Sequence, residues 1–405
     1  MPETTTLRSG TIRVDLLLGD NAFVPFASSA AGAAIIDEAL VAPLELPPLN
    51  DCVVPGDRVV IVADPETPLL PEILTSVWER LAVAMGSEIS ATILLPPDPT
   101  GRDWQAFQEL LPEHLRRQIP VHIHNPDDES GRSYLASSAG GERIYLSTQL
   151  IDADFIVNVG MIGFSGVLGY GGTTSSIYPA LSDAGAIRSA RRTGHIELTP
   201  DDKRPLRELV DEIGWLLGLQ FAVQIIPASD GGVARVISGA IGPVMRAGQT
   251  ALNDNWRITH DSDVELVVVS VPGQRQEFDW KHIGAALATA SKLVAEDGRI
   301  VVVADCEAPH GPGLQMLRRC REPEELLRPL SLEPPVDAVE SVQLIRALQR
   351  ARVYLLSHLP EDLVEDLGLL AMSSAGELQR LVDSAESVAV IANANYAWAE
   401  IQVPV

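Results

Sequence analysis

Short apolar runs rich in β-branched residues alternate with helical patterns along most of this 405-residue chain. The runs at residues 58–63, 91–95 and 154–159 have the character of buried strands, and residues 70–83 carry apolar side chains at helical spacing. Strands that alternate with helices are joined by crossover connections, which favour parallel pairing. The pattern therefore predicts an α/β fold with mainly parallel sheets.

The same alternation resumes after a polar stretch at residues 253–256, with further strands at 264–271 and 299–304 and a helical pattern between them. A chain of this length exceeds the usual size of a single hydrophobic core. We therefore expect two α/β domains, residues 1–255 and 256–405, with a cleft between them.

The overall composition limits the classes of protein to which this chain can belong. Hydrophobic residues make up 46% and charged residues 21%, the balance of a soluble globular protein. The formal net charge of −25 argues against nucleic acid and anionic membranes as partners, because both need clustered Lys and Arg. The three cysteines form no CxxC pair, and no signal peptide or membrane-spanning run is evident. We expect a cytoplasmic protein whose partner is a small molecule.

A glycine-rich loop, GYGGTTSS at residues 169–176, follows a predicted strand. Backbone N–H groups exposed by the glycines, together with the hydroxyls of residues 173–176, suit a phosphate oxyanion. The loop matches neither a dinucleotide fingerprint nor a P-loop, because the first lysine of the chain is Lys203. Its pattern fits a phosphate site and a structural turn alike. The arginines expected to assist an anion there are Arg188, Arg191 and Arg192.

Several acidic and histidine side chains are candidates for chemistry. Asp64 and Asp98 each follow a predicted parallel strand, at the sheet edge where α/β proteins place ligands. They could act in acid–base catalysis, or they could form turns beside proline. His195 is a candidate lone acid or base, with a surface role as the alternative. His122 and His124 share a strand face, a geometry compatible with a metal, but a solvated strand-end pair explains them better, and we assign no metal ligand.

Several segments of the chain resemble the lactate racemase (LarA) family. The opening EALVAPLELPPL at 38–49 and VPGDRVVIV at 54–62 are similar to the start of that family's sequences. The later segments follow in the family's order: residues 121–128, 145–160, 169–179, 279–280 and 299–306. The resemblance covers nearly the whole chain and implies the family's α/β fold. Active members of the family racemise a 2-hydroxy acid with a nickel-pincer nucleotide.

The same resemblance shows that the family's site residues are replaced at several positions. The family's loop carries a lysine that holds the cofactor covalently, and that position is Ser175 here. Ser165 and Asp98 stand where two family histidines are implied, and Pro68 stands where an arginine is implied. A third histidine is retained as His195. The family's C-terminal glutamine and lysine fall near Lys281 and Gly284.

We therefore expect no covalently attached cofactor. The expected catalytic residues are His195, Asp98 and Asp64. The expected cofactor- or ligand-binding residues are Thr67, Ser165, Gly169, Gly171, Gly172, Thr173, Thr174, Ser175 and Ser176. Two functions stay open: a divergent 2-hydroxy-acid racemase or epimerase with altered or lost use of the cofactor, and a catalytically inactive homologue that binds a small molecule or nucleotide. Because losing a general base costs about 10²–10⁴-fold in rate, we expect no racemisation of lactate above background.

Overall fold

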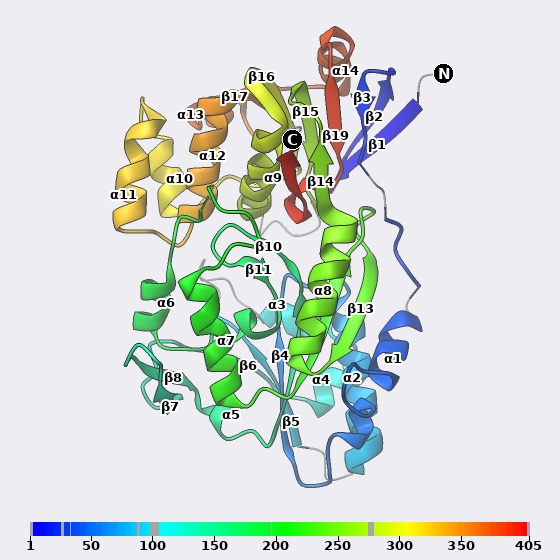
Figure 1. Ribbon diagram of the computed structural model, residues 1–405, viewed down its shortest axis with the longest axis vertical. Coiled ribbons are helices and arrows are strands. Elements are labelled where there is room, and N and C mark those ends of the chain that lie inside the picture. The colour runs from blue at the N-terminus through cyan, green and yellow to red at the C-terminus, as the bar shows by residue number, and fades with distance from the viewer. Residues whose placement is uncertain are drawn as a thin grey trace.

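A computed structural model describes residues 3–25, 28–32, 34–86, 90–97, 105–195, 197–273 and 279–402. Two six-stranded sheets dominate it, one in the lower and one in the upper part of Figure 1. The first has the order β13 (Val233–Gly239), β12 (Phe221–Pro227), β9 (Phe155–Met161), β4 (Arg58–Ala63), β5 (Ser90–Leu95), β6 (Val121–Ile123). Its strands are parallel except β13, which pairs antiparallel with β12.

Helices cover both faces of the first sheet, because its central strands are apolar on both sides. Val59 and Ile61 of β4 pack with α1 (Ala34–Val41) and α2 (Leu70–Met85). The alternate residues Val60 and Val62 pack on the other face with α7 (Pro205–Leu217). The remaining helices of this half are α3 (Gln105–Leu110), α4 (Glu113–Gln118), α5 (Thr148–Ile151), α6 (Ala184–Ala190) and α8 (Ile241–Trp256).

The second sheet has the order β18 (Leu370–Met372), β17 (Ala351–Leu356), β16 (Val294–Val303), β15 (Val264–Ser270), β19 (Val388–Ile391), β3 (Ala22–Phe23), all parallel. Val267 and Val269 of β15 face a core shared with α9 (Asp279–Leu293) and α12 (Ala338–Arg350). The other helices here are α10 (Pro312–Leu317), α11 (Leu327–Leu332), α13 (Glu361–Asp366) and α14 (Ala375–Ser384). The predicted α/β fold with mainly parallel sheets is confirmed.

The N-terminal hairpin lies against the second sheet rather than the first (Figure 1). It consists of β1 (Glu3–Ser9) and β2 (Ile12–Leu18), whose buried Leu7 and Leu16 pack with Leu266 and Val301. The next strand, β3, pairs with β19. Residues 3–23 therefore pack with the part of the chain that follows residue 256, and the division into domains at residue 255 remains a prediction.

In each sheet there is a point at which the chain stops adding strands on one side and continues on the other. In the first sheet the chain runs from β4 to β5 and β6 on one side, and later adds β9 and β12 on the other. In the second it runs from β15 through β18, and then adds β19 on the opposite side of β15. Such switch points open a crevice outside the carboxyl ends of the strands, where open α/β sheets bind ligands. The segments after β4, β15 and β19 are therefore the first places to look for a site.

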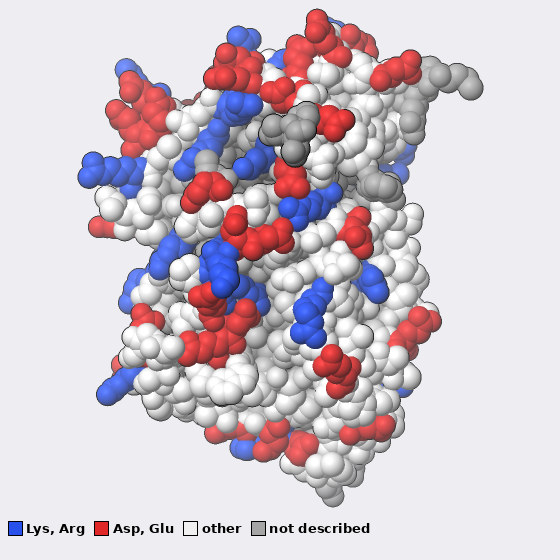
Figure 2. All heavy atoms as spheres, in the orientation of Figure 1, with Lys and Arg blue, Asp and Glu red and all other residues white. Residues whose placement is uncertain are grey.

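The surface carries charges of both signs. In the face shown in Figure 2, Lys and Arg side chains lie among Asp and Glu side chains. Within the described part of the chain, no helix combines the length and the apolar character needed to cross a membrane.

Candidate functional site

A cavity of about 750 Å³ lies where the carboxyl edges of the two sheets meet. The first sheet contributes the segment after β4, with Glu66, Pro68 and Leu69. The second sheet contributes residues 270–273 after β15 and 390–393 at the end of β19. The rest of the lining comes from the N-terminal hairpin, the turn after β12 and the neighbouring helices: Thr5, Thr6, Arg8, Gly10, Val24, Pro25, Ser229, Asp230, Gly231, Asn255, Trp256, Ile258, His282 and Tyr396. This is the position that the switch points predict for a ligand.

Two non-glycine residues that line this cavity have left-handed backbone conformations. Leu69 has φ = 56° and Asn393 has φ = 51°. Asn393 is held in place by its N–H, which donates to Ser270 Oγ at 3.2 Å, and by its Nδ2, which donates to the Ser229 carbonyl at 2.7 Å. A left-handed conformation is unusual for leucine, and such strained residues gather at functional sites.

The predicted catalytic residue Asp64 shapes the turn that leads to the cavity. Its Oδ1 accepts the N–H of Glu66 at 3.0 Å, and its own N–H donates to the Val159 carbonyl at 2.9 Å. Thr67, predicted to bind a cofactor, is completely buried, and its Oγ1 has no hydrogen-bond partner among the residues that the structure describes. Asp64 therefore positions Glu66 beside the cavity, whereas the Thr67 side chain is closed off from it.

Glu66 forms an ion pair that sequence reasoning missed. Its Oε1 lies 2.5 Å from Nζ of Lys281 on α9. Glu340 on α12 adds a third charged group, and its pKa is raised to about 7 by burial, with further upward contributions from Asp337 and Glu66 that Lys281 opposes. The sequence did offer a signal for Glu66, because this residue lies shortly after a predicted buried strand. Glu340 lies in an ordinary amphipathic helix and gave no local signal.

The helices that carry these groups pack closely at Gly284. A Cβ added there would lie 2.8 Å from the Cα of Glu340 on α12. This is one of the two positions near which the resemblance placed a family lysine or glutamine. A long side chain at Gly284 is therefore excluded by the packing of α9 on α12, and Lys281 is the lysine that reaches the cavity edge.

The glycine-rich loop is closed by its own hydrogen bonds. It comprises β11 (Gly169–Gly171), paired with β10 (Gly163–Ser165), and a 3-10 turn over Thr173–Ser176. Ser175 Oγ accepts the N–H of Gly172 at 2.8 Å. Ser176 Oγ donates to Asn158 Oδ1 at 3.0 Å. Both hydroxyls are therefore engaged inside the protein.

The two threonines of the loop are engaged in the same way. Thr174 Oγ1 donates to Asp211 Oδ1 at 3.0 Å, and Thr173 Oγ1 donates to Met245 Sδ at 3.7 Å. The N–H of Thr173 donates to Gln224 Oε1 at 3.0 Å. Three of the hydroxyls thus bond the loop to β9, α7 and α8, and that of Ser175 closes the loop on itself, which favours the structural turn over a phosphate cradle.

The loop glycines allow close approach of protein atoms rather than of a ligand. At Gly169, with φ = 77°, a Cβ would lie 2.4 Å from the Pro200 carbonyl oxygen. At Gly172, with φ = 113°, a Cβ would lie 2.7 Å from Ile162 Cγ1. Gly171 has more room, because the nearest atom to its Cβ position is 3.7 Å away.

An arginine that the sequence did not single out hydrogen-bonds to this loop. Arg207 Nη1 donates to the Tyr170 carbonyl at 3.1 Å, and its Nη2 donates to Thr174 Oγ1 at 3.3 Å. Arg192, from the predicted set, donates to the backbone carbonyls of Ser189 and Arg191. Arg207 lies on α7, which packs against the loop. Tertiary packing rather than sequence proximity therefore determines which arginine hydrogen-bonds to the loop.

Two further predicted residues meet at the turn between β10 and β11. Ser165 Oγ accepts the N–H groups of Val167 and Leu168 at 3.3 and 3.1 Å. The N–H of His195 donates to the Gly166 carbonyl at 2.8 Å, and its Nδ1 lies 3.0 Å from Glu197 Oε1. The imidazole is therefore oriented by a carboxylate, with 42% of its side chain exposed.

The predicted catalytic and binding residues do not lie together in the lining of the cavity. A Cβ at Gly160 would lie 3.6 Å from both Asp64 Cβ and Gln224 Oε1, so Asp64 lies close to the base of the loop. Neither the loop residues nor His195 line the cavity. Asp98 lies outside the described residues.

Of the two histidines on β6, His124 is engaged with the backbone. His124 is buried, its Nε2 lies 2.6 Å from the Ser182 carbonyl oxygen, and burial lowers its pKa. Within the described ranges, no group of three or more His, Cys, Asp or Glu side chains is arranged to hold a metal ion.

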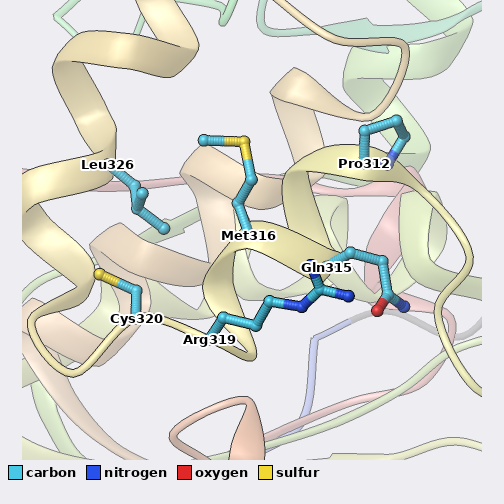
Figure 3. A pocket seen from close by; sticks show the side chains of 6 residues that line it. All are labelled: Pro312, Gln315, Met316, Arg319, Cys320 and Leu326. Carbon is cyan, nitrogen blue, oxygen red and sulfur yellow. The ribbon is translucent and has the colours of Figure 1, made fainter.

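A second hollow, of about 540 Å³, lies on the surface at α10 (Figure 3). Its lining comes from α10 and the segment that follows: Pro312, Gln315, Met316, Arg319, Cys320 and Leu326. None of the predicted site residues belongs to it.

Comparison with known proteins gives a family match for one part of the chain. Residues 20–197 match the family model described as the lactate racemase N-terminal domain. This segment belongs to that domain family. The lactate racemase apoprotein from Thermoanaerobacterium thermosaccharolyticum is similar over 98% of this chain and 100% of that one, with a TM-score of 0.81 and 16% identity.

A second solved structure, of a protein from Thermotoga maritima, is similar over 93% of this chain and 100% of its own chain. Its TM-score is 0.66 and its identity 14%. At these identities the two structures establish the shared fold. No curated protein is significantly similar to this chain in sequence.

Proposed function

We propose that this protein binds a small organic molecule in the cavity between the carboxyl edges of its two sheets, without a covalently attached cofactor. The observation that carries the proposal is the 750 Å³ cavity itself, bordered by the segments after β4, β15 and β19. The Glu66–Lys281 ion pair at its edge supplies charge of both signs. Catalysis is not required for this function.

The residues present do not fit the family's covalent cofactor. The implied anchor position is Ser175, whose Oγ accepts a hydrogen bond from Gly172 and which cannot form the lysine linkage. The first lysine of the chain is Lys203. Side chains that would surround an attached group at this loop are instead hydrogen-bonded to one another.

The cavity lining indicates the chemical class of the ligand. Arg8 and Glu66 provide opposite charges, Thr5, Thr6 and Asn255 provide groups for hydrogen bonding, and Trp256, Ile258 and Val390 provide apolar surface. A molecule as small as lactate fills a minor part of such a volume, which falls in the range of pockets for larger ligands. A hydroxylated organic acid of sugar-acid or nucleoside size suits this mixture best.

A second candidate function is isomerisation of a hydroxy acid. It is favoured by the His195–Glu197 pair, because a carboxylate that orients an imidazole is a common arrangement for a general base. Racemisation by the family's route also needs a hydride acceptor, which protein side chains do not supply. The residues seen here provide the base alone, which places this candidate second.

Ligand binding is tested by thermal shift of the wild type against a panel of hydroxy acids, sugar acids and nucleosides. Thr5→Trp should fill part of the cavity and abolish the ligand-induced rise in Tm. Thr4→Trp is the matched control, because Thr4 precedes it on β1, is exposed and is not part of the lining. A ligand that stabilises the wild type and Thr5→Trp equally contradicts the proposed location.

Cofactor attachment is tested by intact-protein mass spectrometry after co-expression with the enzymes that make the nickel-pincer nucleotide. The expected result is the unmodified mass, and an adduct on residues 169–176 would overturn the proposal. Chiral analysis of D- and L-lactate then separates the two candidates. Racemisation that is lost in His195→Gln would favour the isomerase.

A further inference from the structure

The cavity between the two sheets is lined in part by apolar side chains that the fold leaves exposed. Val24, directly after β3, is 43% exposed, and Leu69, directly before α2, is 39% exposed. Their chain neighbours Pro25 and Pro68 line the same cavity. Single exposed apolar residues are ordinary on a protein surface, but several of them in one cavity indicate a surface for a ligand.

Leu69 holds this exposed position in a strained backbone conformation. Its φ of 56° and ψ of 28° are left-handed, a region that glycine and asparagine adopt far more readily than leucine. Because much of the residue is exposed, packing in the core offsets only part of that strain. Strain that the packing does not offset is typical of positions that contact a ligand. The conformation therefore favours a ligand contact for the Leu69 side chain.

Arg8 on β1 brings a positive charge to the same cavity. It is exposed, and no hydrogen bond or ion pair engages its guanidinium in the described part of the chain. Asp15, on the other strand of the hairpin, accepts instead from Thr6 Oγ1 at 2.6 Å and from Arg13 Nε and Nη2 at 3.2 and 3.1 Å. The guanidinium of Arg8 can therefore receive an acidic group of a ligand through two parallel N–H groups.

The carboxylates that line the cavity are engaged by donors of the protein. Glu66 forms the ion pair at the cavity rim. Asp230 Oδ2 accepts the N–H of Ala30 at 2.9 Å, and its Oδ1 accepts the N–H of Gly232 at 3.1 Å. The charge that the described lining still offers to a ligand is therefore positive, and it adjoins apolar surface. Such a lining is complementary to a molecule with one acidic group and an apolar body.

We propose that the cavity selects a carboxylic acid with an apolar body, aromatic or branched aliphatic, whose carboxylate binds Arg8 and whose body contacts Val24 and Leu69. This inference rests on the proposed function and narrows it, because it predicts that acids with an apolar body bind most tightly. A volume of about 750 Å³ leaves room for such a body. The formal net charge of −25 favours a singly charged carboxylate over a doubly charged phosphate at a single arginine.

The test compares the affinity of the wild-type protein for three probes by isothermal titration calorimetry. The probes are 3-phenylpropionate, its neutral amide, and propionate, which lacks the ring. We expect 3-phenylpropionate to bind about 10-fold more tightly than the amide, because the amide loses the charge-assisted hydrogen bonds. It should bind about 10–100-fold more tightly than propionate, because propionate loses the apolar contact. Equal affinity for the acid and either of the other probes overturns the inference.

Variants assign the two contacts to residues. Arg8→Gln should lower the affinity for 3-phenylpropionate to that for the amide, whereas Arg117→Gln, at an exposed position outside the lining, should keep the difference. Leu69→Asn should weaken 3-phenylpropionate binding by about 10-fold without loss of stability to urea, because asparagine suits the left-handed backbone. Leu17→Asn, an exposed leucine outside the lining, is its control. Wild-type affinity in the Arg8 or the Leu69 variant overturns the inference.

The outcomes also separate this inference from the proposed function. Binding of 3-phenylpropionate that Thr5→Trp abolishes supports both. If a sugar acid or a nucleoside binds in a way that Thr5→Trp abolishes, and 3-phenylpropionate does not bind, the proposed function stands and the inference is overturned. If none of these compounds binds, both are overturned.

Discussion

Nζ of Lys281 on α9 lies 2.5 Å from Oε1 of Glu66, the second residue after Asp64 at the end of β4. The two residues are 215 positions apart in the chain. Glu66 belongs to the carboxyl edge of the first sheet, and α9 follows β15 of the second. This ion pair therefore links the two sheets at the rim of the cavity.

The first prediction concerns the strength of that link. A double-mutant cycle with Glu66→Gln and Lys281→Met should give a coupling energy of about 0.5–1 kcal/mol, because the Lys281 side chain is 59% exposed and solvent screens the pair. Urea denaturation measures it. The Glu113–Arg117 pair, exposed on a single short helix, provides the comparison and should give about 0.3–0.5 kcal/mol. A coupling of zero at Glu66–Lys281 would mean that the pair does not hold the sheets together.

The second prediction concerns pH. The pKa of Glu340 is about 7 in the folded protein and 4.5 when unperturbed. Between these values the folded state keeps a proton that the unfolded state loses, so the free energy of unfolding should fall as pH rises from 4.5 to 7. The fall amounts to at most about 3 kcal/mol, since one pKa unit corresponds to about 1.4 kcal/mol.

Glu340→Gln should remove this fall and make the protein more stable than the wild type at pH 8. Urea denaturation at pH 5 and pH 8 checks it. Glu361→Gln, at an exposed position on α13, should keep the wild-type dependence. Equal pH dependence in wild type and Glu340→Gln would rule out Glu340 as its source.

The third prediction concerns the glycine-rich loop. Gly172→Ala should destabilise the protein by about 2–4 kcal/mol, because the new Cβ meets both a positive φ and Ile162 Cγ1 at 2.7 Å. Gly56→Ala is the matched control. It has φ = 97° with no atom within 4 Å of the Cβ position, and should cost about 1 kcal/mol. Similar losses of stability in the two variants would show that the loop can shift to accommodate a side chain at residue 172.

The fourth prediction concerns Thr67. Thr67→Val should leave the free energy of unfolding unchanged or raise it by up to about 1 kcal/mol, because it removes a buried hydroxyl that has no partner. Thr174→Val, which removes a hydroxyl bonded to Asp211, should instead cost about 1–2 kcal/mol. Thermal and urea denaturation compare them. A clear loss of stability in Thr67→Val would reveal an acceptor for its Oγ1.

The sequence alone was sufficient for the fold class. The apolar run of β4 and the spacing of Leu70, Ile73, Leu74, Val77 and Leu81 in α2 predicted a buried strand and a helix. Both are present with these residues buried, apart from Arg58 at the exposed start of β4. Side-chain direction within a helix or strand follows from backbone geometry a few residues long. The lack of any lysine before Lys203 was equally plain, and it bears on cofactor attachment without any structure.

Only the tertiary structure decided what the candidate residues do. The hydroxyls of residues 173–176 looked available for a phosphate, but Asn158, Gln224 and Asp211 arrive from distant elements and bind the loop. Thr67 is buried, and Glu66 forms an ion pair with Lys281 at the cavity rim. Hydrogen bonds and ion pairs act over a few ångströms in space, and only the folded chain determines which residues lie that close.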